Sequence, residues 1–246
     1  MLNIICISKG VEGLKQTLDS FAFQQNKSAR LIFVFRDVDK EHQAFAEKVG
    51  QQYVSYSVIK NKCNSITNAC NLGILQCDPG HLLFIDAGDF LSSPASIGLV
   101  LGHITKYSTC LAFDSHLMWK NKVYLRKVTT GKKPNIGHVG FIGVVDKNTL
   151  LGEIASYSSD YDWILKQINK YGYEYCANEV IATFKLGGVS TFPTWMNVLV
   201  AVKRESFKTK LKYIMRFTLR LVLGDQGYVK FMMKYNRYEA VDVSGA

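Results

Sequence analysis

The sequence predicts an α/β protein whose mixed, mainly parallel sheet is flanked by helices and followed by a C-terminal basic, amphipathic helical extension. Apolar strand-like segments alternate with helix-like segments through the first half of the chain, which is the β-α-β rhythm of a parallel sheet. Positive charge is concentrated near the C-terminus, in a segment with helical periodicity. Hydrophobic residues make up 48% of the 246 residues and aromatic residues 12%, which is enough for a packed core.

The first half of the chain contains alternating strands and helices. We expect strands over 2–7, 31–35, 53–58 and 82–85, and helices over 11–23, 39–49 and 64–77. In the first helix, apolar side chains fall on one face at about 100° per residue: Val11, Leu14, Leu18 and Phe21. The third helix is expected to stop at Asp78-Pro79-Gly80, because proline and glycine end helices.

The second half of the chain is more mixed. Extended segments are expected over 109–113, 117–128 and 141–145, with a loop over 129–135, a helix over 160–171 that ends at Gly172, and a strand over 174–184. Composition changes near residue 195. We therefore expect one domain over 1–195 and a basic helical tail over 196–246.

The tail carries most of the charge. The chain has 30 Lys and Arg against 20 Asp and Glu, a net charge of +10. Residues 203–237 contain ten basic and two acidic residues, a net charge of +8, which leaves +2 for everything else. The high isoelectric point therefore does not imply a basic active-site groove.

The tail is amphipathic when it is drawn as a helix. One face carries Phe207, Leu211, Ile214, Met215, Leu221 and Val222, and a basic row beside it carries Lys208, Lys212, Arg216 and Arg220. Such a helix can lie on an anionic membrane surface through residues 203–237, pack on its own domain with a solvated charged face, or pair with a second protomer in a homo-oligomer. Specific nucleic-acid binding is not expected, because no zinc-finger spacing, RNA-binding motif or helix-turn-helix accompanies the charge.

The sequence predicts a cytoplasmic protein. No stretch approaches the ~18 consecutive apolar residues of a transmembrane helix, and the first residues do not resemble a signal peptide. The six cysteines include no Cys-x-x-Cys pair, so they are expected to be reduced, buried thiols rather than zinc ligands. Cys63, Cys70 and Cys77 recur every seven residues, which predicts core packing on one helix face.

Two carboxylates follow directly on a buried strand in Phe84-Ile85-Asp86-Ala87-Gly88-Asp89. Ligands of open α/β sheets bind beyond the carboxyl ends of the strands. Asp86 and Asp89, with small residues between them, suit a hard divalent cation such as Mg²⁺ or Mn²⁺ and leave room for phosphates. The alternative is a polar turn in which both carboxylates cap the next element.

A second acidic segment, Ser159-Asp160-Tyr161-Asp162-Trp163, opens the helix expected over 160–171. A carboxylate at a helix N-terminus stays ionised at neutral pH and suits the role of a general base. The alternative is an ordinary N-cap by Ser159 or Asp160. Trp163 suits either stacking on a sugar ring or packing in the core.

Taken together, these segments resemble the family-2 glycosyltransferases, and in particular their bacterial surface-polysaccharide branch. The resemblance spans roughly residues 1–190. Four stretches carry it in the family's order: the strand Ile4-Ile5-Cys6-Ile7-Ser8, the helix Ile66-Thr67-Asn68-Ala69-Cys70-Asn71-Leu72-Gly73-Ile74, the segment Phe84 to Asp89, and the segment Ser159 to Trp163. His138, in Ile136-Gly137-His138-Val139-Gly140-Phe141, also fits this branch.

The resemblance implies the Rossmann-like GT-A fold and the inverting transfer of a hexose from a nucleotide sugar, expected to be UDP-linked, to a lipid-linked saccharide. The product would belong to a surface polysaccharide such as O-antigen or capsule, made at the inner face of the cell membrane by a peripheral enzyme. Asp89 would bind Mn²⁺ or Mg²⁺ on the donor's diphosphate, Asp86 would lie near the ribose or the metal, and Asp160 would be the catalytic base.

The resemblance also assigns residues to the two substrates. The nucleotide-sugar side would comprise Ser8, Asp37, Asn68, Asn71, Asp86, Ala87 and Gly88. The acceptor side would comprise His138, Asp162 and Trp163.

The chain departs from the family pattern at three places. Gly88 stands where the metal segment often carries a third acid, Asn68 stands where the helix motif carries Asp, and Phe35-Arg36-Asp37-Val38-Asp39 replaces the acid-rich segment after the second strand. These departures support an alternative, a non-catalytic GT-A-like domain that serves as a membrane-associated assembly partner.

Overall fold

The structure is a computed structural model that describes residues 1–63, 65–105, 108–131, 134–148, 150–151, 159–187, 192, 195, 198–199, 207–236 and 238–241. Two compact units are formed, the first by Met1–His116 with Lys127–Phe184 and the second by Leu117–Arg126 with Lys185–Ala246. The expected division at residue 195 falls in a stretch of which only single residues are described, and it stays a prediction.

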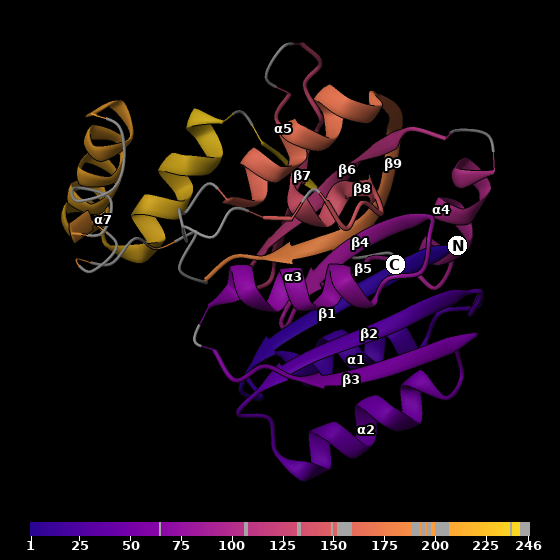
Figure 1. The fold of residues 1–246 in the computed structure, drawn as a ribbon. Helices are drawn as coiled ribbons and strands as arrows, with labels where there is room; N and C mark the ends of the chain where they lie inside the picture. Colours follow the sequence, from indigo (N-terminus) through magenta and orange to yellow (C-terminus); the bar gives the residue numbers. More distant parts are fainter. Residues whose placement is uncertain are drawn as a thin grey trace. The chain divides into compact units, whose positions relative to one another are not determined.

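A mixed, mainly parallel sheet forms the centre of the first unit (Figure 1). Its strands lie in the order β6-β8-β4-β1-β2-β3, with β5 and β9 paired beside this path. β4, β1, β2 and β3 are parallel neighbours, and β8 runs antiparallel to β4 and β6. The bounds are β1 Leu2–Lys9, β2 Ala29–Arg36, β3 Ser55–Lys60, β4 His81–Asp86, β5 Phe90–Leu91, β6 Cys110–Trp119, β8 Phe141–Val144 and β9 Tyr173–Lys185.

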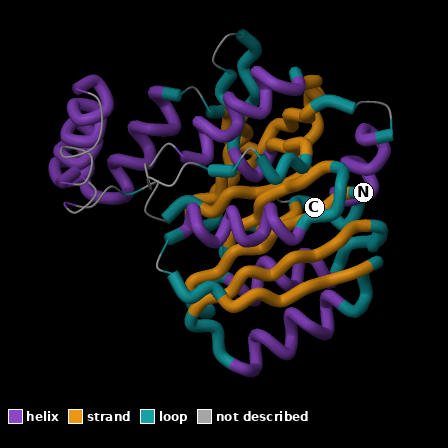
Figure 2. The backbone as a smooth tube through the Cα atoms, in the orientation of Figure 1, coloured by secondary structure: helices purple, strands orange, loops and turns teal. Residues whose placement is uncertain are grey.

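Helices cover both faces of this sheet (Figure 2). One hydrophobic cluster joins the sheet to α1, α2 and α4, and the other joins it to α3 and α5. Successive residues of β1 alternate between the clusters: Ile4 and Cys6 belong to the first, Ile5 and Ile7 to the second. The strand is therefore apolar throughout, as expected for a parallel strand buried on both faces. The helix bounds are α1 Leu14–Ala22, α2 Lys40–Gly50, α3 Ile66–Gln76, α4 Ser96–Ile104 and α5 Ser159–Tyr171.

The structure confirms the alternation of strands and helices and changes several details. The first helix starts at Leu14 rather than at residue 11, because Gly13 has φ 73°. The single extended segment expected over 117–128 is two strands, because the chain turns at Lys120 with φ 54°. Helix α4 and the short strands β5 and β10 were not predicted, and the expected helix start at Asn64 lies outside the described residues.

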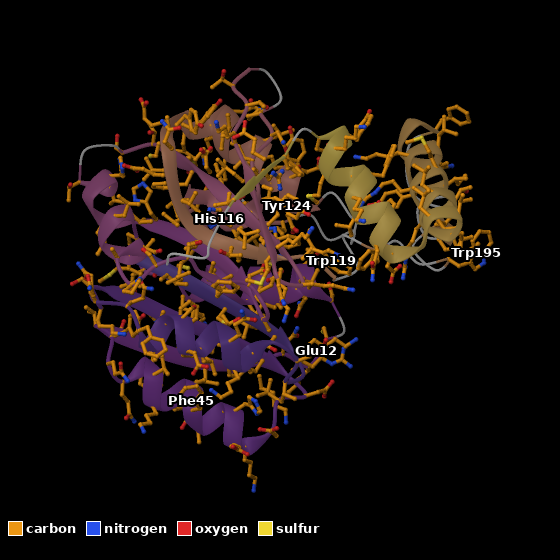
Figure 3. The ribbon with its side chains drawn as sticks, turned by 180° about the vertical axis from the view of Figure 1, so that it is seen from behind. Glu12, Phe45, His116, Trp119, Tyr124 and Trp195 are labelled. Carbon is orange, nitrogen blue, oxygen red and sulfur yellow. The ribbon has the colours of Figure 1, made fainter. Side chains whose placement is uncertain are left out.

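The second unit contains β7 (Lys122–Arg126), which pairs antiparallel with β10 (Glu239–Val241), and the helix α7 (Phe207–Tyr235). The rings of Trp119 and Phe192 lie 5.1 Å apart, and those of Trp195 and Phe217 5.7 Å apart; Figure 3 labels both tryptophans. α7 is interrupted at Gly224, whose φ of 63° and ψ of 172° are not helical. Among the described residues, no helix combines the length and hydrophobicity needed to cross a membrane.

Five of the six cysteines are buried, and all six are free thiols. Cys70 lies on α3 and Cys77 caps its end, both in the core as predicted. The prediction for Cys63 was wrong: this residue precedes the helix and is exposed. The first cysteine of the seven-residue repeat therefore lies before the helix, where the repeat no longer indicates burial.

Candidate active site

The turn after β4 places two carboxylates at the edge of the sheet. Asp86 ends β4, where it is in register with Ile7 of β1, and the backbone N–H of Ala87 donates to the carbonyl of Ile7 at 2.8 Å. The N–H of Asp89 donates to the carbonyl of Asp86 at 2.9 Å, which closes a tight turn around Gly88, at φ 103°. Asp89 is buried and Asp86 is half-buried.

Helix α1 holds this turn in place through hydrogen bonds and close backbone packing. The Oγ1 of Thr17 accepts from the N–H of Gly88 at 2.9 Å and donates to the carbonyl of Asp89 at 2.6 Å. Gly13 lies so close that a Cβ atom there would be 2.6 Å from the Cα of Gly88. The start of α1 and the carboxylate turn are therefore packed backbone to backbone.

His138 lies beside the two carboxylates, on a 3-10 turn that covers His138–Gly140. Its Nε2 is 3.4 Å from Oδ2 of Asp89 and 3.8 Å from Oδ2 of Asp86, and its ring packs edge-on against Phe184. Burial alone would lower the pKa of His138, but the hydrogen bond that its ring donates to Asp89 and the charges of Asp86, Asp89 and Asp160 outweigh it and raise the pKa to about 9.

The pKa of Asp86 is raised as well, which for a carboxyl group favours the neutral form, whereas the raised pKa of His138 favours the charged form. Burial raises the pKa of Asp86 to about 7; His138 opposes this shift, while the charges of Asp89 and Asp160 add to it. Three carboxylates and one imidazole thus interact electrostatically within one site. Such a site binds a divalent cation favourably, because the cation relieves the repulsion between the carboxylates.

A pocket brings these groups together with the expected base. Asp160, in the first turn of α5, lines it with Asp86 and His138. The rest of the lining is apolar and comes from α3, β4, the segment before α5, and α5: Ile66, Cys70, Phe84, Leu151 and Trp163. The first unit alone contains all eight lining residues.

Trp163 belongs to the core as well as to the pocket. Only 4% of it is exposed, and its ring packs edge-to-face against Phe84 and Phe141 at 5.4 and 5.7 Å. Asp162, its neighbour in the chain, is exposed and does not line the pocket. This geometry favours core packing over sugar stacking for Trp163.

Residues expected on the nucleotide side lie at the carboxyl ends of β1 and β2 and on α3. Ser8 is buried and its Oγ donates to the carbonyl of Gly10 at 2.6 Å. Asp37 has φ 55°, and its carboxylate is 3.2 Å from Nε of Arg36. The amide of Asn71 bonds the N–H and C=O of Leu151, whereas Asn68 is half-buried at the start of α3.

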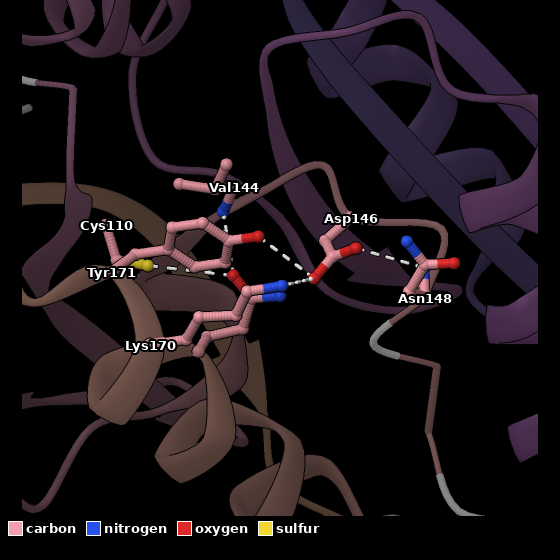
Figure 4. A network of polar contacts seen from close by, with 7 residues as sticks. Cys110, Val144, Asp146, Asn148, Lys170 and Tyr171 are labelled. Atoms are coloured by element: carbon pink, nitrogen blue, oxygen red, sulfur yellow. Dashed lines mark hydrogen bonds and ion pairs between the residues drawn. The ribbon is translucent and has the colours of Figure 1, made fainter.

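A polar network fixes the C-terminal part of α5 against the sheet (Figure 4). Oδ2 of Asp146 accepts from Nζ of Lys170 at 2.6 Å and from the hydroxyl of Tyr171 at 2.9 Å. Oε1 of Gln167 accepts from the N–H of Val144 at 3.0 Å. Sequence reasoning missed this network and the role of Thr17, because both join residues far apart in the chain.

Three side chains lie close enough together to hold a metal ion between them: Asp86, Asp89 and His138. Their ligand atoms all lie within 4.8 Å of one another, and the set of two carboxylates and one imidazole suits Mn²⁺. In the structure His138 lies beside the two carboxylates, and its expected role on the acceptor side stays a prediction. A second group with the same spacing, His103, Cys176 and Glu179, contains a 2.6 Å contact between His103 and Glu179.

Comparisons with solved structures define the fold class. S. aureus TarS has a TM-score of 0.60 and 14% identity, over 89% of this chain and 43% of that chain, so this chain spans less than half of full-length TarS. TarS 1-349 in complex with UDP-GlcNAc has a TM-score of 0.61 and 12% identity, over 89% of this chain and 72% of that chain. This protein therefore has a GT-A glycosyltransferase-like fold, as predicted.

A third structure shares the fold with a lower TM-score and a lower sequence identity. The mannosyltransferase PcManGT from Pyrobaculum calidifontis, in complex with GDP-Man and Mn²⁺, has a TM-score of 0.56 and 8% identity, over 93% of this chain and 72% of that chain. No protein-family model and no curated protein sequence matches the chain. The likeness at these identities is one of fold.

Proposed function

We propose that the protein is an inverting glycosyltransferase that moves a hexose from a UDP-linked donor to a lipid-linked saccharide, in the synthesis of a bacterial surface polysaccharide such as O-antigen or capsule. One observation carries the proposal: a pocket at the carboxyl end of β4 joins Asp86, His138 and Asp160, with Asp89 beside them. The structural neighbours in complex with UDP-GlcNAc and GDP-Man support the class of donor.

The donor side of the site is built from the turn after β4. Asp89 and Asp86 would hold Mn²⁺ or Mg²⁺, joined by His138 once its imidazole has released the proton that the carboxylates stabilise. When bound, the ion would neutralise charge on a diphosphate leaving group. Ser8, Asp37 and Asn68 lie at the same edge or on the adjoining helix and would orient the nucleoside.

The acceptor side is built from α5. Asp160 would accept the proton of the acceptor hydroxyl as that oxygen attacks the anomeric carbon from the face opposite the leaving diphosphate. The Asp146 network holds the C-terminal end of α5, and Asp160 lies in the first turn of the same helix. Asp162 would contact the acceptor from the exposed side of the same helix, and a lipid-linked acceptor would keep the enzyme peripheral at the inner face of the membrane.

Thermal unfolding with and without UDP, in Mn²⁺ and in EDTA, tests the donor site. A ligand that binds only the folded state stabilises it by RT ln(1 + [L]/Kd), about 2.7 kcal/mol at a hundredfold excess over Kd. We expect a Mn²⁺-dependent rise in Tm with UDP that is lost in Asp89→Asn. Asp19→Asn, which removes an exposed carboxylate on α1, is the matched control.

The Asp160→Asn variant separates binding from chemistry. It should keep the UDP-dependent rise in Tm while transfer to a lipid-linked saccharide falls by about a hundredfold or more, the usual contribution of a general base. If no nucleoside diphosphate raises Tm in the presence of Mn²⁺, the enzyme assignment fails and a non-catalytic assembly partner becomes the better account of Gly88 and Asn68.

A further inference from the structure

The interruption at Gly224 divides α7 into two helical segments, 207–223 and 225–235. The second segment is buried on one side, through Tyr228, Val229 and Met233. The ring of Tyr228 lies 6.3 Å from that of Phe192, another buried residue of the same unit. The second segment is therefore part of the core of the second unit.

The first segment is attached by its polar side. Nε of Arg216 donates to the hydroxyl of Tyr228 at 2.8 Å. The guanidinium of Arg220 lies 4.9 Å from the ring centre of Phe192 and 2.7 Å from Oδ1 of Asp225. Two of the four cations in the predicted basic row thus contact the chain itself, which sequence periodicity did not reveal; the side chain of Lys208, another member, lies outside the described residues.

Because its polar side faces the protein, the first segment presents its apolar side to the surroundings. Six apolar residues, with exposed fractions between 43% and 80%, form this outward face: Phe207, Leu211, Ile214, Met215, Leu221 and Val222. At 100° per residue they fall within an arc of about 120°, roughly opposite Arg216. A helix of a soluble protein normally buries such a stripe against its own core.

Charge indicates what covers the outward face. Lys210 and Lys212 flank it, and the second segment exposes a stacked aromatic pair, Phe231 and Tyr235, beside Lys230 and Lys234. Residues 203–237 carry a net charge of +8. A second copy of this surface would be repelled, whereas an anionic bilayer complements both the charge and the apolar stripe.

We propose that the outward face of α7 binds anionic phospholipid, with the first segment lying in the plane of the bilayer at the boundary between headgroups and acyl chains. The inference deepens the proposed function, since it identifies the surface that would bring the enzyme to a lipid-linked acceptor. The binding itself requires neither nucleotide nor metal.

Vesicle co-sedimentation of the full chain in EDTA tests this proposal. The protein should bind vesicles of phosphatidylcholine with 30% phosphatidylglycerol, and binding should weaken with NaCl and be at least about tenfold weaker on pure phosphatidylcholine. Phe207→Gln with Val222→Gln should reduce the partition coefficient by about tenfold or more, because two large apolar side chains no longer enter the bilayer. Phe23→Gln with Val54→Gln, at positions 73% and 62% exposed in the first unit, is the matched control and should bind as wild type does.

Three results would overturn the proposal. If both double variants lose vesicle binding to the same extent, the outward face is not the binding surface. If wild-type protein binds neutral and anionic vesicles equally, the ligand is not anionic lipid. A lipid-free dimer in light scattering that dissociates in Phe207→Gln with Val222→Gln would assign the face to a second copy. Asp89→Asn should bind vesicles normally, so that a failure of lipid binding and a failure of the UDP–Mn²⁺ site are separate outcomes.

Discussion

Gly13→Ala tests whether the carboxylate turn depends on close packing against α1. The added Cβ would lie 2.6 Å from the Cα of Gly88, and ordinary contact begins at 3.4 Å, so that the turn must move by about 0.8 Å. Gly13 also has φ 73°, where an L side chain costs about 1–2 kcal/mol. Overpacking typically adds 1–3 kcal/mol, which gives an expected total loss of about 2–5 kcal/mol.

Gly10→Ala is the control for the cost of placing a side chain on a residue with positive φ. Gly10 has φ 89°, yet nothing lies within 4 Å of a Cβ built there, so this variant should lose only about 1–2 kcal/mol. Urea unfolding followed by tryptophan fluorescence measures both losses. The difference between the two variants isolates the contact with Gly88.

The same pair of variants tests the proposed metal centre. Metal–ligand distances tolerate shifts of only about 0.2 Å, so a displaced turn should weaken the Mn²⁺-dependent rise in Tm in Gly13→Ala and leave it intact in Gly10→Ala. The reasoning is refuted if Gly13→Ala is no less stable than Gly10→Ala and keeps its full response to Mn²⁺.

Three further predictions concern the supports of the site and the sheet. Thr17→Val removes the hydrogen bonds of its hydroxyl to the turn and should cost about 1–3 kcal/mol in urea unfolding, with a weaker response to Mn²⁺. Asp146→Leu removes the buried acceptor of the Tyr171 hydroxyl and of the Asn148 N–H and should lower stability by about 1–3 kcal/mol, whereas Asp146→Asn should cost less because its oxygen still accepts hydrogen bonds. Burial lowers the pKa of His81 below 6.5, so the unfolded chain binds a proton that the folded chain does not, and stability falls as pH drops below about 6.5. His81→Gln should reduce this loss, measured as the urea midpoint between pH 7 and pH 5; an unchanged pH dependence would show that His81 is not responsible.

The parts of the fold that sequence predicts are those with a local signal. Buried parallel strands are continuous apolar runs, so the ends of β1, β2 and β4 were predicted to within two residues. Asp86 and Asp89 were found because carboxylates that directly follow such a strand must lie at the sheet edge. α4 was missed, since Ser96–Ile104 is almost wholly apolar, includes two glycines and lacks a side-chain cap.

The rest of the site depends on contacts between distant residues. Nothing in the segment around His138 indicates that it meets Asp89 rather than an acceptor, and nothing in α1 marks Thr17 as a partner of residues 71 and 72 positions away. Periodicity identified the apolar face of α7 but not whether that face points into the protein or toward the surroundings. That depends on the contacts of Arg216 and Arg220 with residues of the second segment and with Phe192.

The distribution of cysteines gives the protein a chemically addressable position. Burial raises the pKa of Cys110 to about 11 and of Cys77 and Cys176 to about 12, so that these thiols carry almost no thiolate at neutral pH and are shielded from reagents. Cys63 alone is exposed, three residues before Ile66 of the pocket wall. A maleimide dye should therefore attach at one position without mutagenesis, where its emission would report the arrival of a donor in the pocket.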